Sequence, residues 1–441
     1  MTLKTFTREL RRGLGSAIVE LKANHERGKY RNIVMRACLS DIAYDTQVEG
    51  TKGHYLYTAI KTFENHEDFI DKMIEKFRKK ICRRLSEQII ATLCCFSDDG
   101  CKKSADALIE KYIYLKNRLP KDSSLWLDGR EQFENLMTRR LDNEGFEFFK
   151  QAINDMGEMI LEHGNDDCVF YDCFLYVAEE TFGKKIYTYI ENEKHKNVAE
   201  FYRFYKSLTS IRAANTFQNK EKITIEFLIN YANELLEKSE GIPFAITGYA
   251  KRFVEEATEK ELEELAHAML DEPNEFIKTA LSRAFIFVDF PLDIDLLLPY
   301  TASEYKWIRD AVVGILSRLK NSRIRKLALQ MFESKDIESA LDLIKLNFEI
   351  EDNVHVRKHI RRIKRVSFRT IGNIEHIYNE HKSVVCGDVL LHLYKNAECS
   401  HCRYAVVGMM IDNNLMPQKI LEECRYDSYG KTRELAKRRY L

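Results

Sequence analysis

Proline and glycine are scarce in this chain of 441 residues, which contains only six prolines and 18 glycines. Folds built from strands need frequent turns, and those turns rely on glycine and proline. The scarcity therefore argues against a strand-rich fold and favours many helices joined by short polar turns.

Motifs for catalysis are also missing. His355 and His359 have the spacing of a zinc-binding helix, but Val356 stands where a His-Glu-x-x-His motif requires glutamate. The chain contains no Gly-x-Ser-x-Gly elbow, no phosphate-binding Gly-x-x-x-x-Gly-Lys and no complete Gly-x-Gly-x-x-Gly. We therefore expect no cofactor, and the sequence favours a non-enzymatic role.

No apolar run approaches the length that spans a membrane. Residues 1–14 lack the cationic and then apolar pattern of a secretory leader. The 11 cysteines are odd in number and scattered, which favours free thiols in a reducing compartment over a disulfide framework. We therefore expect a cytoplasmic protein without a membrane partner.

Net charge is absent overall, since 69 basic residues balance 69 acidic ones. This balance removes the simplest argument for a nucleic-acid binder. The distribution is uneven, because residues 221–300 hold 7 basic and 17 acidic side chains, whereas residues 351–441 hold 17 and 11. Such blocks could attract an anionic partner or join molecules to one another, or they could simply be solvated helix faces.

Apolar residues recur at helical spacing through almost the whole chain. Windows with this period are 68–81, 104–116, 146–161, 198–211, 223–236, 260–270, 276–288 and 338–348. Two pairs of segments also match one another: 308–316 matches 402–410, and 324–328 matches 432–436. Internal matches of this kind are typical of stacked helical hairpins, so we expect an all-α fold.

The last third of the chain resembles HEAT repeats. The first matching pair is offset by 94 residues, or two units of about 47, which lies at the upper end of the HEAT range. HEAT units place an Asp or Asn turn between two helices, followed by a basic residue, as in Asp352 with Arg357, Asp427 with Arg433, and Asp45 with Lys52. The chain is also similar to uncharacterised bacterial HEAT-like proteins, most clearly around 38–56 and 398–441. The resemblance implies turn carboxylates and cations that pair between adjacent repeats.

This resemblance implies one continuous α–α superhelix over residues 1–441, a HEAT/armadillo-like solenoid whose repeats are clearest in 301–441. No linker interrupts the pattern. Residues 118–130 are the expected place for a hinge or a loop between helices.

The turn at residues 45–50 is the most polar in the chain. Asp45, Gln47 and Glu49, with Lys52 beyond them, could converge on a ligand or on the backbone of a partner. The other reading is structural, because Asp, Thr and Gly are the residues that cap helices and end them. Asp45, Gln47 and Glu49 are candidate partner-binding residues.

The strongest electrostatic feature is the run from Val356 to Arg365. Val356, Ile360 and Ile363 form an apolar stripe, and the rest of the predicted helix carries six cations: Arg357, Lys358, Arg361, Arg362, Lys364 and Arg365. Like charges four residues apart repel by about 0.2–0.5 kcal/mol, so this crowding does not serve helix stability. The six cations are candidate contacts for phosphate, an anionic protein or an acidic neighbouring repeat, unless they only solvate the helix.

The segment Cys399-Ser400-His401-Cys402 could form half of a zinc site. A second Cys-x-x-Cys is absent, and Cys402 matches Ile308 in the paired segment, which indicates a core position. We therefore expect no metal.

Two functions remain open. A non-enzymatic scaffold would bind a protein partner by shape and charge along the solenoid. The alternative is a nucleic-acid-binding protein that resembles the HEAT-like alkylpurine DNA glycosylases, in which an aromatic residue and a carboxylate approach the damaged nucleotide. Trp307 and Asp310 would take those places here, and the basic run would hold phosphate.

Overall fold

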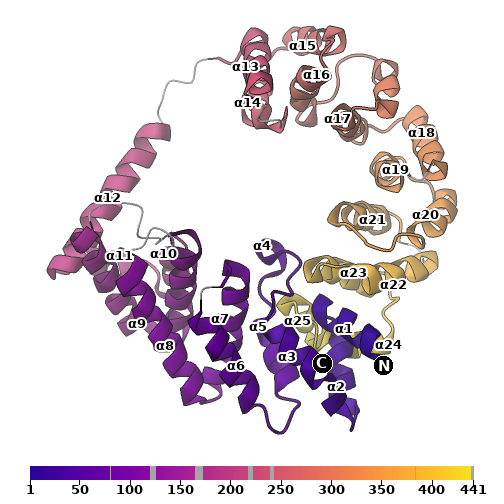
Figure 1. Cartoon of the computed structure of the whole chain (residues 1–441). Coiled ribbons are helices and arrows are strands. Elements are labelled where there is room, and N and C mark those ends of the chain that lie inside the picture. The colour runs from indigo at the N-terminus through magenta and orange to yellow at the C-terminus, as the bar shows by residue number, and fades with distance from the viewer. Residues whose placement is uncertain are drawn as a thin grey trace. The chain divides into compact units, whose positions relative to one another are not determined.

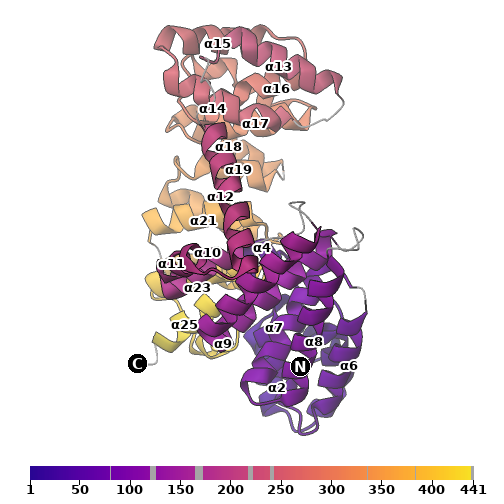
Figure 2. The same ribbon diagram turned by 90° about the vertical axis from the view of Figure 1, so that its left-hand side faces the viewer.

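The computed structural model describes residues 1–79, 81–119, 126–163, 172–216, 222–238, 243–334, 336–382 and 384–438, whose helices are drawn in Figures 1 and 2. Every regular element in these ranges is a helix, and the only extended pairing there is an isolated bridge between Val366 and Ala397. The predicted all-α class is confirmed. Residues 120–125 of the expected hinge lie outside the described residues.

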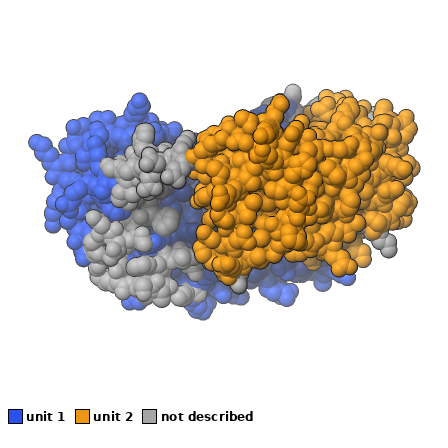
Figure 3. All heavy atoms as spheres, turned by 90° about the horizontal axis from the view of Figure 1, so that it is seen from above, with its two compact units in different colours: residues 1–218, 398–404, 416–441 blue, residues 219–397, 405–415 orange. Residues whose placement is uncertain are grey.

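The chain divides into two compact units, coloured separately in Figure 3. Unit 1 contains residues 1–218, 398–404 and 416–441, so both ends of the chain belong to it. Its helices are α1 (Leu3–Arg12), α2 (Gly15–Ala23), α3 (Arg31–Cys38), α4 (Thr46–Glu49), α5 (Gly53–Ile60), α6 (Glu67–Arg78), α7 (Arg83–Asp98), α8 (Lys102–Arg118), α9 (Trp126–His163), α10 (Asp172–Phe182), α11 (Lys185–Asn192), α12 (Lys196–Thr216), α24 (Gln418–Cys424) and α25 (Gly430–Arg438).

Unit 2 contains residues 219–397 and 405–415. Its helices are α13 (Ile225–Glu237), α14 (Thr247–Glu256), α15 (Glu259–Asp271), α16 (Glu275–Ser282), α17 (Lys306–Leu316), α18 (Ser322–Glu333), α19 (Ile337–Ile344), α20 (Asn353–Ile360), α21 (Phe368–Glu380) and α22 (Gly387–Asn396). The first residues of helix α23 (Ser400–Asp412) belong to unit 1, and its remaining residues belong to unit 2.

Alternate helices lie side by side within each unit. In unit 1, α1 contacts α3, α3 contacts α5, α5 contacts α7 and α7 contacts α9, while α6 contacts α8. In unit 2, α17 contacts α19 and α19 contacts α21, while α18 contacts α20 and α20 contacts α22. Each helix therefore buries an apolar stripe against helices before and after it, as α6 does with Phe69, Ile70, Met73, Ile74 and Phe77.

The first matching pair of segments has the same burial pattern. The segment 308–316 lies in α17 and 402–410 lies in α23, and Ile308 and Cys402 are both buried. Val312 matches Val406, Val313 matches Val407, and all four are fully buried. The sequence match therefore reflects equivalent core positions.

Two of the predicted helices end before the last apolar residue of the window that predicted them. The window 276–288 continues past α16 only as a 3-10 turn at Arg283–Ile286, and α19 ends at Ile344 although the period reaches 348. Asn347 explains the second end. Its side chain accepts from the backbone N–H of Asn321 and donates to the carbonyls of Leu319 and Leu343, and these bonds favour a turn over another helical turn.

Candidate functional site

The polar turn at residues 45–50 forms the short helix α4 and is held by its own side chains. Asp45 caps this helix, since its carboxylate accepts a hydrogen bond from the N–H of Gln47 at 3.0 Å. Gly50 ends the helix with a φ of 70°, a left-handed conformation that suits glycine. Local sequence chemistry therefore accounts for Asp45 and Gly50.

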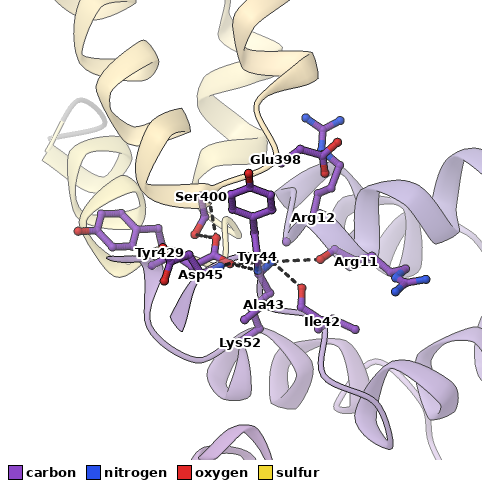
Figure 4. A network of polar contacts seen from close by, with 12 residues as sticks. Arg11, Arg12, Ile42, Ala43, Tyr44, Asp45, Lys52, Glu398, Ser400 and Tyr429 are labelled. Atoms are coloured by element: carbon purple, nitrogen blue, oxygen red, sulfur yellow. Dashed lines mark hydrogen bonds and ion pairs between the residues drawn. The ribbon is translucent and has the colours of Figure 1, made fainter. Parts of the chain in front are cut away.

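Glu49 is the centre of a buried network, and its partners Tyr44, Lys52 and Ser400 are labelled in Figure 4. Its Oε2 accepts from the backbone N–H of Ser400 at 2.7 Å and from the Ser400 hydroxyl at 2.8 Å. Its Oε1 accepts from the backbone N–H groups of Tyr44 and Asp45. Burial by itself raises the pKa of a carboxyl group, but Lys52 and these donors bring the pKa of Glu49 below its ordinary value. Glu49 is therefore ionised, and both of its carboxylate oxygens accept hydrogen bonds inside the protein.

Lys52 completes the network from the opposite side. Its Nζ lies 3.4 Å from Oε1 of Glu49 and donates to the carbonyls of Arg11 at 3.0 Å and Ile42 at 2.9 Å. An ammonium group has three donors, and each of the three has an acceptor here. The network joins α1, the α4 turn and the beginning of α23, all within unit 1.

A second buried ion pair lies in the same unit. Arg403 and Asp427 are both fully excluded from solvent, and Nε of Arg403 lies 3.0 Å from Oδ2 of Asp427. Arg403 also donates from Nη2 to the carbonyl of Gly13 at 3.2 Å, and the N–H of Ser428 donates to the same carbonyl at 2.9 Å. The two networks fasten the C-terminal residues of unit 1 to its N-terminal helices.

These contacts correct part of the sequence prediction. Glu49 was a candidate for partner binding, but its side chain is fully buried and its carboxylate is occupied, so it is not available to a partner. The ion pair between Arg403 and Asp427 was not predicted from the sequence. The match between Arg309 and Arg403 marked the position, but nothing in it identifies the carboxylate that Arg403 binds.

Asp45 and Gln47 line an open cavity of about 450 Å³ in unit 1 together with Tyr44, Thr46, Cys82, Arg83 and Arg84. Its cations are engaged. Arg84 donates to the carbonyls of Ala43 and Tyr44 and pairs with Asp41, while Arg83 pairs with Glu87 and Glu131. The exposed groups that remain at the rim are Gln47, Cys82 and the ring of Tyr44, which is 61% exposed.

The basic run is not one continuous helix, because α20 ends at Ile360 and residues 361–365 form turns and bends. Val356 and Ile360 are buried as predicted, whereas Ile363 is only partly buried. Val366 pairs with Ala397 in the isolated bridge, and extended backbone at that position requires the helix to stop before it.

Half of the six candidate cations make ion pairs within unit 2. Arg357 and Arg361 both reach Asp388, Arg357 at 3.0 Å, and Lys358 lies 2.8 Å from Glu333. Arg362, Lys364 and Arg365 are exposed, and no ion pair involves them within the described residues. The structure thus divides the predicted set into three structural and three unpaired cations. The latter belong to unit 2, whereas Asp45 and Gln47 belong to unit 1.

The histidine and cysteine candidates do not form a metal centre. His359 is buried, stacks on Phe332 and lies 3.6 Å from Glu333. Across the ranges that the structure describes, no group of three or more His, Cys, Asp or Glu side chains could hold a metal ion. Within the same ranges, none of the helices combines the length and apolar character needed to cross a bilayer.

Comparison with known proteins gives no relative: no family model, no curated protein and no solved structure matches this chain.

Proposed function

We propose that the chain is a HEAT-like α-solenoid that acts as a non-enzymatic scaffold and binds an acidic segment of a protein partner. The observation that carries this proposal is the triplet of exposed cations Arg362, Lys364 and Arg365, which no carboxylate in the described part of the chain neutralises. Cations that form no ion pair within the fold are available to bind anions of another molecule.

Support for the solenoid comes from ion pairs that repeat along alternate helices of unit 2. Arg325 on α18 binds Asp352 at the start of α20 through two hydrogen bonds of 2.9 and 2.8 Å. Arg357 on α20 in turn binds Asp388 on α22. Stacked repeats bury their faces only against neighbours, so bonds between every second helix are what a solenoid would use to fix its stacking.

Support for a protein partner comes from the surroundings of the unpaired cations. Phe368 follows them at the start of α21 and is 68% exposed, so a cationic and an aromatic group are offered together. Aromatic and arginine side chains are the usual anchors of protein interfaces. Three unpaired cations are fewer than the roughly 6–10 phosphate contacts of a strongly salt-dependent DNA-binding protein, which makes the segment a weak site for a duplex.

The alternative of a DNA-binding protein finds less support at the residues it requires. Trp307 is half-buried, and the ammonium group of Lys306 lies over its ring at 5.8 Å from the centroid. A base that stacked on this face of the ring would have to displace Lys306.

The test is affinity capture with the full chain and a variant in which Arg362, Lys364 and Arg365 are replaced by glutamate. The matched control reverses Lys4, Lys72 and Lys102, three exposed lysines of unit 1, and so produces the same change in net charge. We expect the wild type and the control to recover the same partner and the triple variant of Arg362, Lys364 and Arg365 to lose it. The thermal unfolding temperature should be the same for all three proteins.

A second measurement separates partner classes. Binding of duplex DNA is measured at about 50 and 200 mM salt, where a protein that makes 6–10 phosphate contacts loses about 10³–10⁵ in affinity. The scaffold proposal would be contradicted if the triple variant recovered as much partner protein as the wild type. It would also be contradicted if the wild type bound DNA with a steep salt dependence and the triple variant did not bind.

A further inference from the structure

Cys399 and Cys402 lie together at the start of α23. The carbonyl of Cys399 accepts the N–H of Arg403 at 3.2 Å, which makes Cys399 the residue that opens the helix and places Cys402 in its first turn. Helix geometry puts the Cα atoms of residues three apart at about 5 Å, within the 4.4–6.8 Å that a disulfide requires. Each of the two thiols shifts the pKa of the other, so the side chains interact.

The surroundings favour a thiolate on one sulfur and a thiol on the other. The hydrogen bond from Cys402, aided by the backbone N–H groups of Cys402 and His401, lowers the pKa of Cys399 to about 7 against the effect of burial. The same bond, together with burial, raises the pKa of Cys402. Elsewhere in the chain, burial alone raises the pKa of the Cys38 thiol. The pair therefore differs from an ordinary core cysteine.

We propose that Cys399 and Cys402 form a redox-active dithiol that a hydroperoxide converts to an intramolecular disulfide. The Cys399 thiolate attacks one oxygen of hydrogen peroxide, the O–O bond breaks, and hydroxide leaves as water after taking a proton. Cys399 is then a sulfenic acid. The Cys402 sulfur attacks it, the S–O bond breaks, and the second water leaves with the proton of Cys402. Two thiols are oxidised by two electrons, and one peroxide is reduced to two waters.

Burial decides which oxidant suits the site. Cys399 is 6% exposed and Cys402 is 3% exposed, so a bulky disulfide reagent would need local opening, whereas hydrogen peroxide is little larger than water. Ser400 and Arg403, which border these cysteines, bind Glu49 and Asp427. The dithiol thus lies in the segment that fastens the C-terminal residues of unit 1 to its N-terminal helices.

The experiment exposes the reduced full chain to hydrogen peroxide, blocks remaining thiols with an alkylating reagent and maps every cysteine by peptide mass spectrometry. We expect a Cys399–Cys402 disulfide, reversible by dithiothreitol, to form about tenfold faster than any oxidation of Cys38 or Cys94, whose pKa values are raised. If both Cys399 and Cys402 remain alkylatable while the exposed Cys82 and Cys173 are oxidised, the proposal is wrong.

Single variants assign the two roles. In Cys402→Ser, a sulfenic acid on Cys399 should persist and react with dimedone; in Cys399→Ser, Cys402 should give no such adduct. Dimedone labelling of Cys402 in the second variant would contradict the assignment of Cys399 as the attacking group. Because both positions are buried and a variant could unfold, the peptide map of the wild-type chain decides the proposal by itself.

Discussion

Glu49 and Lys52 form an ion pair from which solvent is excluded, with 2% or less of either side chain exposed. Removing two charges from water is costly, and their attraction offsets this only when hydrogen bonds satisfy the remaining donors and acceptors. Here Ser400, Tyr44 and two backbone carbonyls provide those bonds. Removing one of the two charges should therefore lower the stability of the fold more than replacing both side chains by apolar ones.

The first prediction compares a single variant with a double variant of this pair. Glu49→Gln leaves the Lys52 ammonium buried without its counter-charge and should lower the free energy of unfolding by about 3–5 kcal/mol. Glu49→Gln combined with Lys52→Met removes both charges and should recover part of that loss. Chemical denaturation measures both, with Asp45→Asn as a control that changes a carboxylate of the same turn outside the buried pair. A double variant less stable than the single would contradict the proposed origin of the effect.

A second prediction concerns two glycines with similar backbone and different surroundings. Gly13 has φ 74° and Gly100 has φ 86°, so alanine at either position adopts a left-handed conformation that costs about 1–2 kcal/mol. A Cβ on Gly13 would also lie 2.1 Å from Oγ of Ser428, whereas a Cβ on Gly100 meets nothing within 4 Å. Gly13→Ala should therefore destabilise the chain by a further 1–3 kcal/mol, about the cost of overpacking.

Thermal or urea unfolding of Gly13→Ala and Gly100→Ala provides the comparison. Ser428→Gly removes the two atoms nearest to the new Cβ and should restore part of the difference when it is combined with Gly13→Ala. Equal losses in the two alanine variants would show that backbone strain alone is responsible.

The sequence predicted the helices well because their apolar periods are local, and the structure confirms the core position of Cys402 that its match to Ile308 predicted. It predicted paired turn carboxylates, but it took their partners to be the cations that follow them. The structure pairs Asp352 with the preceding Arg325, and Asp427 with the preceding Arg403. The reason is that an arginine on one helix reaches the next helix of its own layer, which lies further along the chain.

The site itself was less predictable. Glu49 and Ser400 are 351 residues apart, and no local pattern can indicate a contact over that separation. The polarity of the turn at residues 45–50 correctly marked it as unusual, but polarity does not distinguish a carboxylate buried in a network from one that faces a partner. Similarly, the count of six cations gave no sign that Asp388 and Glu333 would neutralise half of them.

Glu20 provides a prediction for acid stability. Hydrogen bonds from Asn24 and Tyr30 lower the pKa of Glu20 to about 2 from an ordinary 4.5. A group with a depressed pKa in the folded state stabilises the fold above its unfolded pKa, and the contribution is lost as the pH falls from 4.5 towards 2. Glu20→Gln should therefore lower the urea midpoint at about pH 6 and have a smaller effect at about pH 3. An equal loss at both pH values would indicate that the ionised state of Glu20 is not what matters.

The Arg–Asp pairs of the chain differ in burial, and their energies should follow it. The exposed fractions of the two side chains are 0% and 0% for Arg403 with Asp427, 28% and 3% for Arg325 with Asp352, and 39% and 26% for Arg357 with Asp388. Water screens an exposed pair, so its contribution is about 0–1 kcal/mol, whereas a charge left unpaired in the interior costs about 3–5 kcal/mol.

Replacing each aspartate by asparagine keeps an oxygen acceptor and the side-chain shape while it removes the charge. The loss of unfolding free energy should be largest for Asp427→Asn, smaller for Asp352→Asn and smallest for Asp388→Asn, and about 0.5 M NaCl should shrink only the last one appreciably. Urea unfolding at low and high salt measures this order. If Asp388→Asn matched Asp427→Asn, the losses would come from the hydrogen bond that each asparagine gives up, because every one of these arginines donates to both oxygens of its aspartate, and not from charge in a medium of low dielectric constant.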